Sequence, residues 1–160
     1  MDEFYSYPIE VAWGDVTTGI IRSYLIDPTG MEDWTDWDPA AQGVHGLSRA
    51  HLAEHGLPPR QVAEEVVRQL TGKTVMATSG ADKDWVHRLI QDTLGEFPDP
   101  GIAWKDAKWH LVGLARGDAT AYQVAMDLAW ERLNAQDIYA HRAANDVRQL
   151  MEVRRILLGG

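Results

Sequence analysis

The first part of the chain shows the alternation of apolar and polar positions that is typical of β-strands. Ile9, Val11 and Trp13 occupy every second position, which is the period of a half-buried strand. We therefore predict a strand over 7–13. A second run rich in β-branched residues covers 20–26, and the turn residues between the two runs predict an antiparallel hairpin.

From residue 48 onward the apolar residues follow helical spacing instead. Val62, Val66 and Leu70 recur every four residues in a segment that opens with two prolines, and Gly72 stands where a C-cap glycine is expected. The predicted helices cover 48–54, 58–70, 81–94, 105–115, 120–134 and 143–157, with a short buried strand at 74–78 and loops at 31–47 and 96–101.

The order of these elements predicts an α/β layer protein with a single domain over 1–160. A hairpin comes first, and helices then surround a further strand. Ser48 is the expected N-cap of the helix that follows it. In the helix over 81–94, Trp85 and Leu89 are expected on the apolar stripe that faces the core.

The composition limits the cellular locations and binding partners that are compatible with the chain. The chain has no cysteine, which excludes disulfides, thiolate metal sites and a cysteine nucleophile. Its acidic start is unlike a secretory signal, and no run approaches the roughly 20 apolar residues that span a bilayer. We expect a cytoplasmic protein with no membrane partner. The net charge of −9 counts against tight binding of long nucleic acid, but not against a short 3′ end in a metal-filled cleft.

The most informative segment for chemistry is HRAAND, at positions 141–146. Two helical residues five positions apart lie about 140° apart around the axis. His141 and Asp146 can therefore meet only if the histidine lies on a loop and the aspartate on the first turns of the next helix. The segment resembles the third motif of DnaQ-like (DEDDh) 3′–5′ exonucleases, in which the histidine activates water and the aspartate holds a divalent ion. A capping histidine beside a solvated aspartate is the structural alternative.

A second segment resembles the same family in the expected order along the chain. Asp82 opens a predicted helix three residues before Trp85, as in the second exonuclease motif, and Asp84 is the alternative residue. An aspartate at a helix start is also an ordinary cap. The order of the motifs, more than this segment alone, supports the resemblance.

A third segment, VHGLS at positions 44–48, is similar to a stretch that precedes the first helix of these exonucleases. We expect His45 to have a structural role or to belong to a substrate-binding loop, and not to be a catalyst. Trp34 and Trp37 lie just before it. Each tryptophan could stack on a base, since stacking needs only an aromatic face, or could cover an edge of the core.

The resemblance implies a ribonuclease H-like fold, in which a mixed β-sheet is flanked by helices in three layers. It also implies metal-dependent hydrolysis at the 3′ end of short single-stranded DNA or RNA. Asp82 and Asp146 would be ligands of Mg²⁺ or Mn²⁺, and His141 would act as the general base. His45 and Trp37 would contact the substrate.

The resemblance is incomplete at the N-terminus. Members of the family begin with a strand ending in Asp-x-Glu, whose carboxylates bridge two metal ions, whereas Asp2 and Glu3 are adjacent and would point to opposite faces of a strand. The first strand would then be missing because the natural start lies upstream, because the chain is degenerate, or because this alignment of the start is wrong. An unpaired sheet edge would favour a homodimer.

Two other functions are compatible with the sequence. A degenerate exonuclease fold would act as a nucleic-acid or protein binding module without catalysis. Separately, His51 and His55 are four residues apart and could share a helix face, as zinc ligands do. The chain has no HExxH motif, and Gly56 and Pro58 follow at once, so a solvated helix end competes with a metal hydrolase.

Overall fold

The computed structural model describes residues 6–95 and 100–160, so most of the predicted loop at 96–101 lies outside the described residues. Internal contacts divide the chain into two compact units. The first contains Met1–Val11 and Tyr24–Lys105, and the second contains Ala12–Ser23 and Asp106–Gly160. Helices and short strands together confirm the predicted mixed α/β class.

The N-terminal hairpin forms as predicted. Strand β1 spans Glu10–Gly14, strand β2 spans Ile21–Leu25, and the two pair as a two-stranded sheet. Asp15 shapes the turn, because its carboxylate accepts a hydrogen bond from Thr17 N at 2.8 Å. The strand starts later than the predicted residue 7, since Pro8 has no amide hydrogen to contribute to a ladder.

The first unit packs its helices around buried aliphatic side chains. After a 3₁₀ turn, η1 (Pro28–Gly30), its helices are α1 (Pro39–His45), α2 (Arg49–His55), α3 (Pro59–Leu70) and α4 (Gly80–Leu94). Helices α3 and α4 pack together, and Val62, Val66 and Leu89 are 0% exposed. Trp85 is 40% exposed, so its predicted place in the core is wrong; the buried part of α4 begins one turn later, at Leu89.

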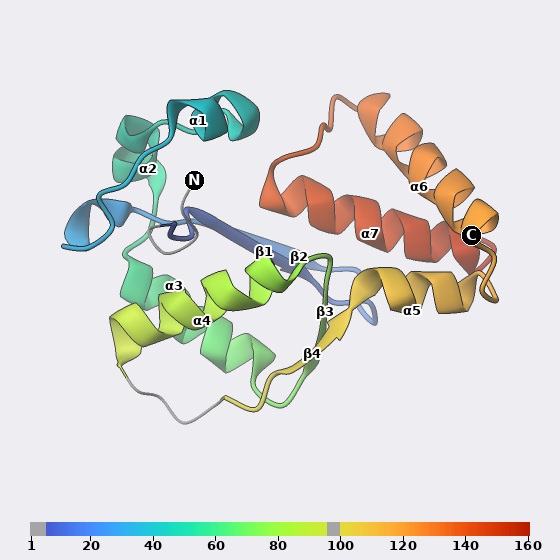
Figure 1. The fold of residues 1–160 in the computed structure, drawn as a ribbon, viewed down its shortest axis with the longest axis horizontal. Helices are drawn as coiled ribbons and strands as arrows, with labels where there is room; N and C mark the ends of the chain where they lie inside the picture. Colours follow the sequence, from blue (N-terminus) through green and yellow to red (C-terminus); the bar gives the residue numbers. More distant parts are fainter. Residues whose placement is uncertain (1–5, 96–99) are drawn as a thin grey trace. The chain divides into compact units, whose positions relative to one another are not determined.

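A βαβ unit completes this part of the chain. Strands β3 (Thr74–Ala77) and β4 (Ala103–Asp106) flank α4 in sequence and pair with each other (Figure 1). Strand β4 was not predicted, and β3 is exposed or half-buried instead of buried. The described strands thus form two separate two-stranded sheets. They do not form the single mixed sheet that the family resemblance implies.

The second unit is mainly a helical layer. Its helices are α5 (Ala107–Leu114), α6 (Ala119–Asn134) and α7 (Ala143–Leu157). Leu111, Ala125, Ala129 and Val153 form its buried cluster, and the two alanines let α6 approach α7 closely. The bounds of α7 match the prediction. Among the described residues, no helix has the length and apolarity needed to cross a membrane.

Helix α1 lies in a segment that was predicted to be a loop. Asp38 caps it, because the carboxylate accepts a hydrogen bond from Ala40 N at 2.8 Å, and Pro39 takes the first helical position. Gly46 ends the helix with a φ of 72°. These are ordinary boundary signals, but α1 contains no fully buried residue, so no apolar period marked it.

Gly56 lets the end of α2 approach the main chain that follows β2. Leu57 N donates a hydrogen bond to Leu25 O, and Asp27 N donates one to Leu57 O, each at 2.9 Å. The chain at Gly56 is therefore held against Ile26 and Asp27. A Cβ atom at this position would lie within 2.8 Å of three main-chain atoms, so only glycine fits without a shift.

We predict that Gly56→Ala lowers the free energy of unfolding by about 1–3 kcal/mol, the usual cost of overpacking. Chemical denaturation followed by circular dichroism measures the change. Gly43→Ala is the matched control, because a Cβ atom at Gly43 meets nothing within 4 Å. Gly43 lies inside α1, where alanine is a better helix former than glycine by about 1 kcal/mol. Equal stability of Gly56→Ala and the parent chain would contradict the tight contact.

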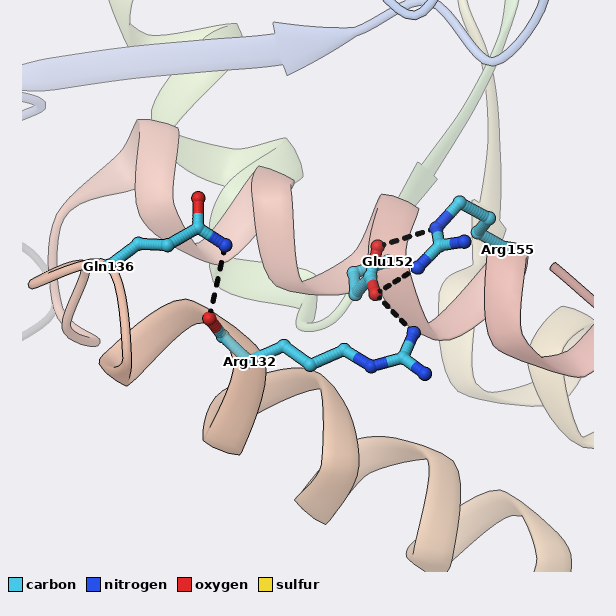
Figure 2. A network of polar contacts seen from close by, with 4 residues as sticks. All are labelled: Arg132, Gln136, Glu152 and Arg155. Carbon is cyan, nitrogen blue, oxygen red and sulfur yellow. Dashed lines mark hydrogen bonds and ion pairs between the residues drawn. The ribbon is translucent and has the colours of Figure 1, made fainter.

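An ion-pair network joins α6 and α7 in the second unit (Figure 2). Glu152 accepts hydrogen bonds from Arg132 Nη1 at 2.8 Å and from Arg155 Nε and Nη2 at 2.8 and 2.7 Å. The hydrogen bonds from Arg155 and then Arg132 lower the pKa of Glu152 from 4.5 to about 2, against the opposing effect of its partial burial. The carboxylate is therefore more stable as an anion in the folded chain.

Because the folded-state pKa of Glu152 is depressed, its contribution is complete above about pH 4.5 and is lost as the pH falls toward about 2. We predict that Glu152→Gln lowers stability at neutral pH by about 1 kcal/mol and that the difference from the parent chain shrinks across this window. Urea denaturation at several pH values tests this. The exposed Glu131 on α6 gives the control Glu131→Gln. A stability difference between Glu152→Gln and the parent chain that does not change with pH would contradict the lowered pKa of Glu152.

Candidate functional site

The segment that precedes α1 is anchored by a buried tryptophan. Trp34 is 0% exposed, and its ring stacks on Tyr7 with centroids 5.2 Å apart and planes 7° apart. Trp34 Nε1 donates a hydrogen bond to Asp92 Oδ2 at 2.7 Å, and Arg88 Nε donates to the same oxygen at 3.2 Å. Trp34 is thus a structural residue, which decides between the two roles left open for it.

Arg49, at the start of α2, ties the same segment to Tyr7, which precedes β1. Its Nη1 lies within hydrogen-bond distance of Tyr7 Oη at 2.9 Å, Trp34 O at 3.3 Å and Thr35 O at 3.2 Å. Tyr7 in turn donates its hydroxyl proton to Asp36 O at 2.6 Å. Burial raises the pKa of Tyr7, with Arg49 acting in the opposite direction, so the hydroxyl remains a donor at neutral pH.

These anchors place Trp37 and His45 together at the wall of a small open hollow. The two rings meet edge to face with centroids 6.0 Å apart, and Tyr7, Ile9 and Asp36 contribute to the lining. The hollow holds about 60 Å³, well below the roughly 300–1,000 Å³ of a pocket for a drug-sized ligand. It can accept the edge of one planar ring or a small polar group, not an enclosed substrate.

The Trp37 and His45 side chains of the hollow are each held by neighbouring residues. Trp37 Nε1 donates to Gln42 Oε1 at 2.7 Å, and the Arg49 guanidinium lies 5.8 Å from the centre of the Trp37 ring. Nδ1 of His45 accepts a hydrogen bond from Leu47 N at 3.0 Å, which leaves Nε2 as the protonated nitrogen of a neutral ring. The ring orientations are therefore fixed before any ligand arrives.

The charge of the hollow favours a donor-rich or cationic ligand group. Asp36 and Asp38 both line it, so two negative charges stand against the one positive charge of Arg49 beside Trp37, and this balance disfavours a phosphate. An aromatic wall beside carboxylates suits a planar ring that carries amino groups, since the ring stacks and the amino groups donate. The hollow could thus contact a base more readily than a nucleic-acid backbone.

In the second unit, His141 and Asp146 have the loop-and-helix placement that their spacing required. His141 precedes α7 in a loop and has a φ of 68°, which is uncommon for a residue with a side chain. Asp146 lies in the first turn of α7. The backbone N–H of His141 donates to Asp146 Oδ1 at 3.2 Å, so the carboxylate helps to hold the loop in this conformation.

The loop that carries His141 is also held by Asn145, which was not among the predicted site residues. Asn145 Nδ2 donates to Tyr139 O at 2.7 Å, and its Oδ1 accepts from Arg148 Nη1 at 2.7 Å. The contact with Tyr139 fixes the turn that presents the exposed His141 side chain, and the contact with Arg148 lies within α7. The sequence carried no separate signal for this role, because an asparagine at a helix start is common.

Asp82 lies at the start of α4 and acts as a capping residue. Its Oδ2 accepts hydrogen bonds from Ser79 N at 3.1 Å and from Thr78 Oγ1 at 3.3 Å, and with Ser79 it forms a capping box. The structural alternative for Asp82 therefore describes what its carboxylate does here. Asp84, two residues further along, is exposed.

The described residues bring the predicted site residues together in two pairs. His45 lies beside Trp37 in the first unit, and His141 lies beside Asp146 in the second. Asp82 belongs to the first unit and Asp146 to the second. Within 6–95 and 100–160, no group of three histidine, aspartate or glutamate residues has the arrangement to hold a metal ion.

Tyr7, which lines the hollow, and Arg49, which contacts the Tyr7 hydroxyl, are residues that the sequence did not reveal. They are 42 positions apart, and neither belongs to a motif. Comparison with protein-family models, curated proteins and solved structures gives no match. The fold defines a mixed α/β protein.

Proposed function

We propose that the chain is a metal-dependent 3′–5′ exonuclease domain that acts on the 3′ end of short single-stranded DNA or RNA. The observation that carries the proposal is the placement of His141 on a loop beside Asp146 in the first turn of α7. This is the geometry that allows a histidine to move while the aspartate stays fixed. It is also the arrangement expected from the resemblance of HRAAND to the third exonuclease motif.

The exposed His141 imidazole would take a proton from the attacking water, a task to which histidine is suited near neutral pH. Asp146 accepts the hydrogen bond from His141 N and would also be a ligand of the metal ion, since Mg²⁺ prefers carboxylate oxygen. Trp37 and His45 would contact a base of the nucleic acid. None of these roles requires a basic surface for long nucleic acid.

The donor set does not by itself complete a two-metal centre. Two ions about 4 Å apart need several carboxylates to offset their repulsion, whereas only Asp82 and Asp146 are candidates and Asp82 is engaged in helix capping. The proposed activity therefore requires carboxylates in addition to these two.

The shortage of carboxylates favours a second candidate function, a binding module without catalysis. In this case the hollow around Trp37 and His45 would be the functional site, and Asp82 and Asp146 would serve the fold. The fixed side-chain orientations of the hollow support binding, because a preformed site loses less conformational freedom on contact with a ligand.

Digestion of a 5′-labelled single-stranded oligonucleotide in Mg²⁺ or Mn²⁺ tests the exonuclease proposal. We expect stepwise shortening from the 3′ end that a chelator stops. His141→Gln should lower the rate by about 100-fold or more, the usual contribution of a general base, and Asp146→Asn should do the same. The exposed His110 and Asp127 provide the matched controls, His110→Gln and Asp127→Asn, which should keep the parent rate.

Absence of shortening in both metals, or equal rates in the parent chain and Asp146→Asn, would overturn the exonuclease proposal. Fluorescence anisotropy with the same oligonucleotide then decides the second candidate. Binding that Trp37→Ala weakens and His141→Gln leaves intact would support a binding module, and no binding by the parent chain would overturn it as a nucleic-acid reader.

A further inference from the structure

Helix α2 carries two histidines that the proposed function does not use. His51 and His55 are one helical turn apart, on the same face of Arg49–His55. Their rings lie with centroids 4.5 Å apart and planes tilted by 51°. Both residues are exposed, so the space around the rings is open to an ion from solution.

We propose that His51 and His55 form a two-histidine site for a transition-metal dication of the kind that prefers imidazole, namely Cu²⁺, Ni²⁺ or Zn²⁺. An ion bound at about 2.0–2.1 Å from a nitrogen of each ring needs those nitrogens roughly 3 Å apart. Rings with centroids 4.5 Å apart reach this separation by small side-chain rotations. Water would fill the other coordination positions.

The helix that carries the pair is fixed at both ends, which favours binding. Ser48 caps it by accepting a hydrogen bond from His51 N at 3.1 Å, and Arg49 is held by three oxygen acceptors. Leu52 is 0% exposed, and Gly56 is pressed against the main chain that follows β2. The two histidines are therefore presented together before an ion arrives, and little chain entropy is lost on binding.

Glu54 adds an acidic neighbour to the pair. Its Oε2 lies 3.6 Å from His55 Nε2, and the side chains of Glu54 and His55 are 76% and 52% exposed. A carboxylate in this position raises the local concentration of cations and can orient the ring of His55.

The chemistry separates this site from the Mg²⁺ or Mn²⁺ of the proposed function. Imidazole suits copper, nickel and zinc, whereas magnesium prefers oxygen ligands. Since no group of three metal-binding side chains exists within the described residues, the ion would have two protein ligands and an open face. Affinity should follow the general order in which copper binds more tightly than nickel or zinc.

Isothermal titration of the full chain with CuCl₂, NiCl₂ and ZnCl₂ above neutral pH tests the site. We expect one tight site for Cu²⁺, at least a tenfold loss of affinity in His51→Gln and in His55→Gln, and release of the ion on acidification as the imidazoles take up protons. Exposed histidines on α4 and α5 give the controls His87→Gln and His110→Gln, which should bind as the parent chain does. Titration with MgCl₂ should give the same result for the parent chain, His51→Gln and His55→Gln.

A second measurement locates the ion independently of affinity. Substoichiometric Cu²⁺ should broaden the imidazole NMR signals of His51 and His55 before those of the other histidines. Parent-like Cu²⁺ affinity in both α2 variants, or selective broadening elsewhere, would overturn the proposal. Circular dichroism of each variant shows that α2 remains folded. These outcomes are independent of the exonuclease test, which depends on Asp146 and Mg²⁺ or Mn²⁺.

Discussion

The hydrogen bonds of the Arg49 guanidinium hold the segments that form both candidate sites of the first unit, the hollow around Trp37 and the histidine pair on α2. One nitrogen of this side chain reaches Tyr7, Trp34 and Thr35, so three stretches of chain meet at one positive charge. Hydrogen bonds with a charged donor are worth about 1.5–3 kcal/mol, more than neutral ones. The same residue begins α2, which links the hollow around Trp37 to the helix that carries His51 and His55.

Local signals in the sequence predicted most of the helices. Ser48 was expected to cap α2, and its hydroxyl accepts a hydrogen bond from His51 N. The bounds of α7 follow from a long apolar period, and Gly72, with a φ of 70°, follows α3 as expected. Helix α1 has capping residues at Asp38 and Gly46 but no row of buried apolar residues, so a loop was predicted there.

Sheet organisation was harder to predict because it depends on contacts between distant segments. Strand β4 has four residues, and its alternation is too short to distinguish it from the start of α5. The family resemblance implied one mixed sheet, whereas the described strands pair two by two. Pairing of β3 with β4 depends on how α4 returns the chain, and no local pattern encodes that return.

The candidate sites divide along the same line. The loop position of His141 and the helical position of Asp146 followed from their spacing, because local geometry decides it. The capping role of Asp82 was one of two interpretations, and the structure supplies the hydrogen bonds that fit it. The hollow could not be predicted, since Tyr7 and Arg49 meet only after the first unit has folded.

Hydrogen exchange at the indole N–H of Trp34 is the most direct test of the account. This group is fully buried and bonded to Asp92, so it exchanges only when the segment anchored by Arg49 opens. Arg49→Lys keeps the charge, but its shorter side chain carries the nitrogen away from the position of Nη1 and its three oxygen partners. It should therefore speed exchange about tenfold, equivalent to roughly 1.4 kcal/mol. The exposed control Arg22→Lys should exchange as the parent chain does. An unchanged rate in Arg49→Lys would contradict the claim that this guanidinium holds the segment in place.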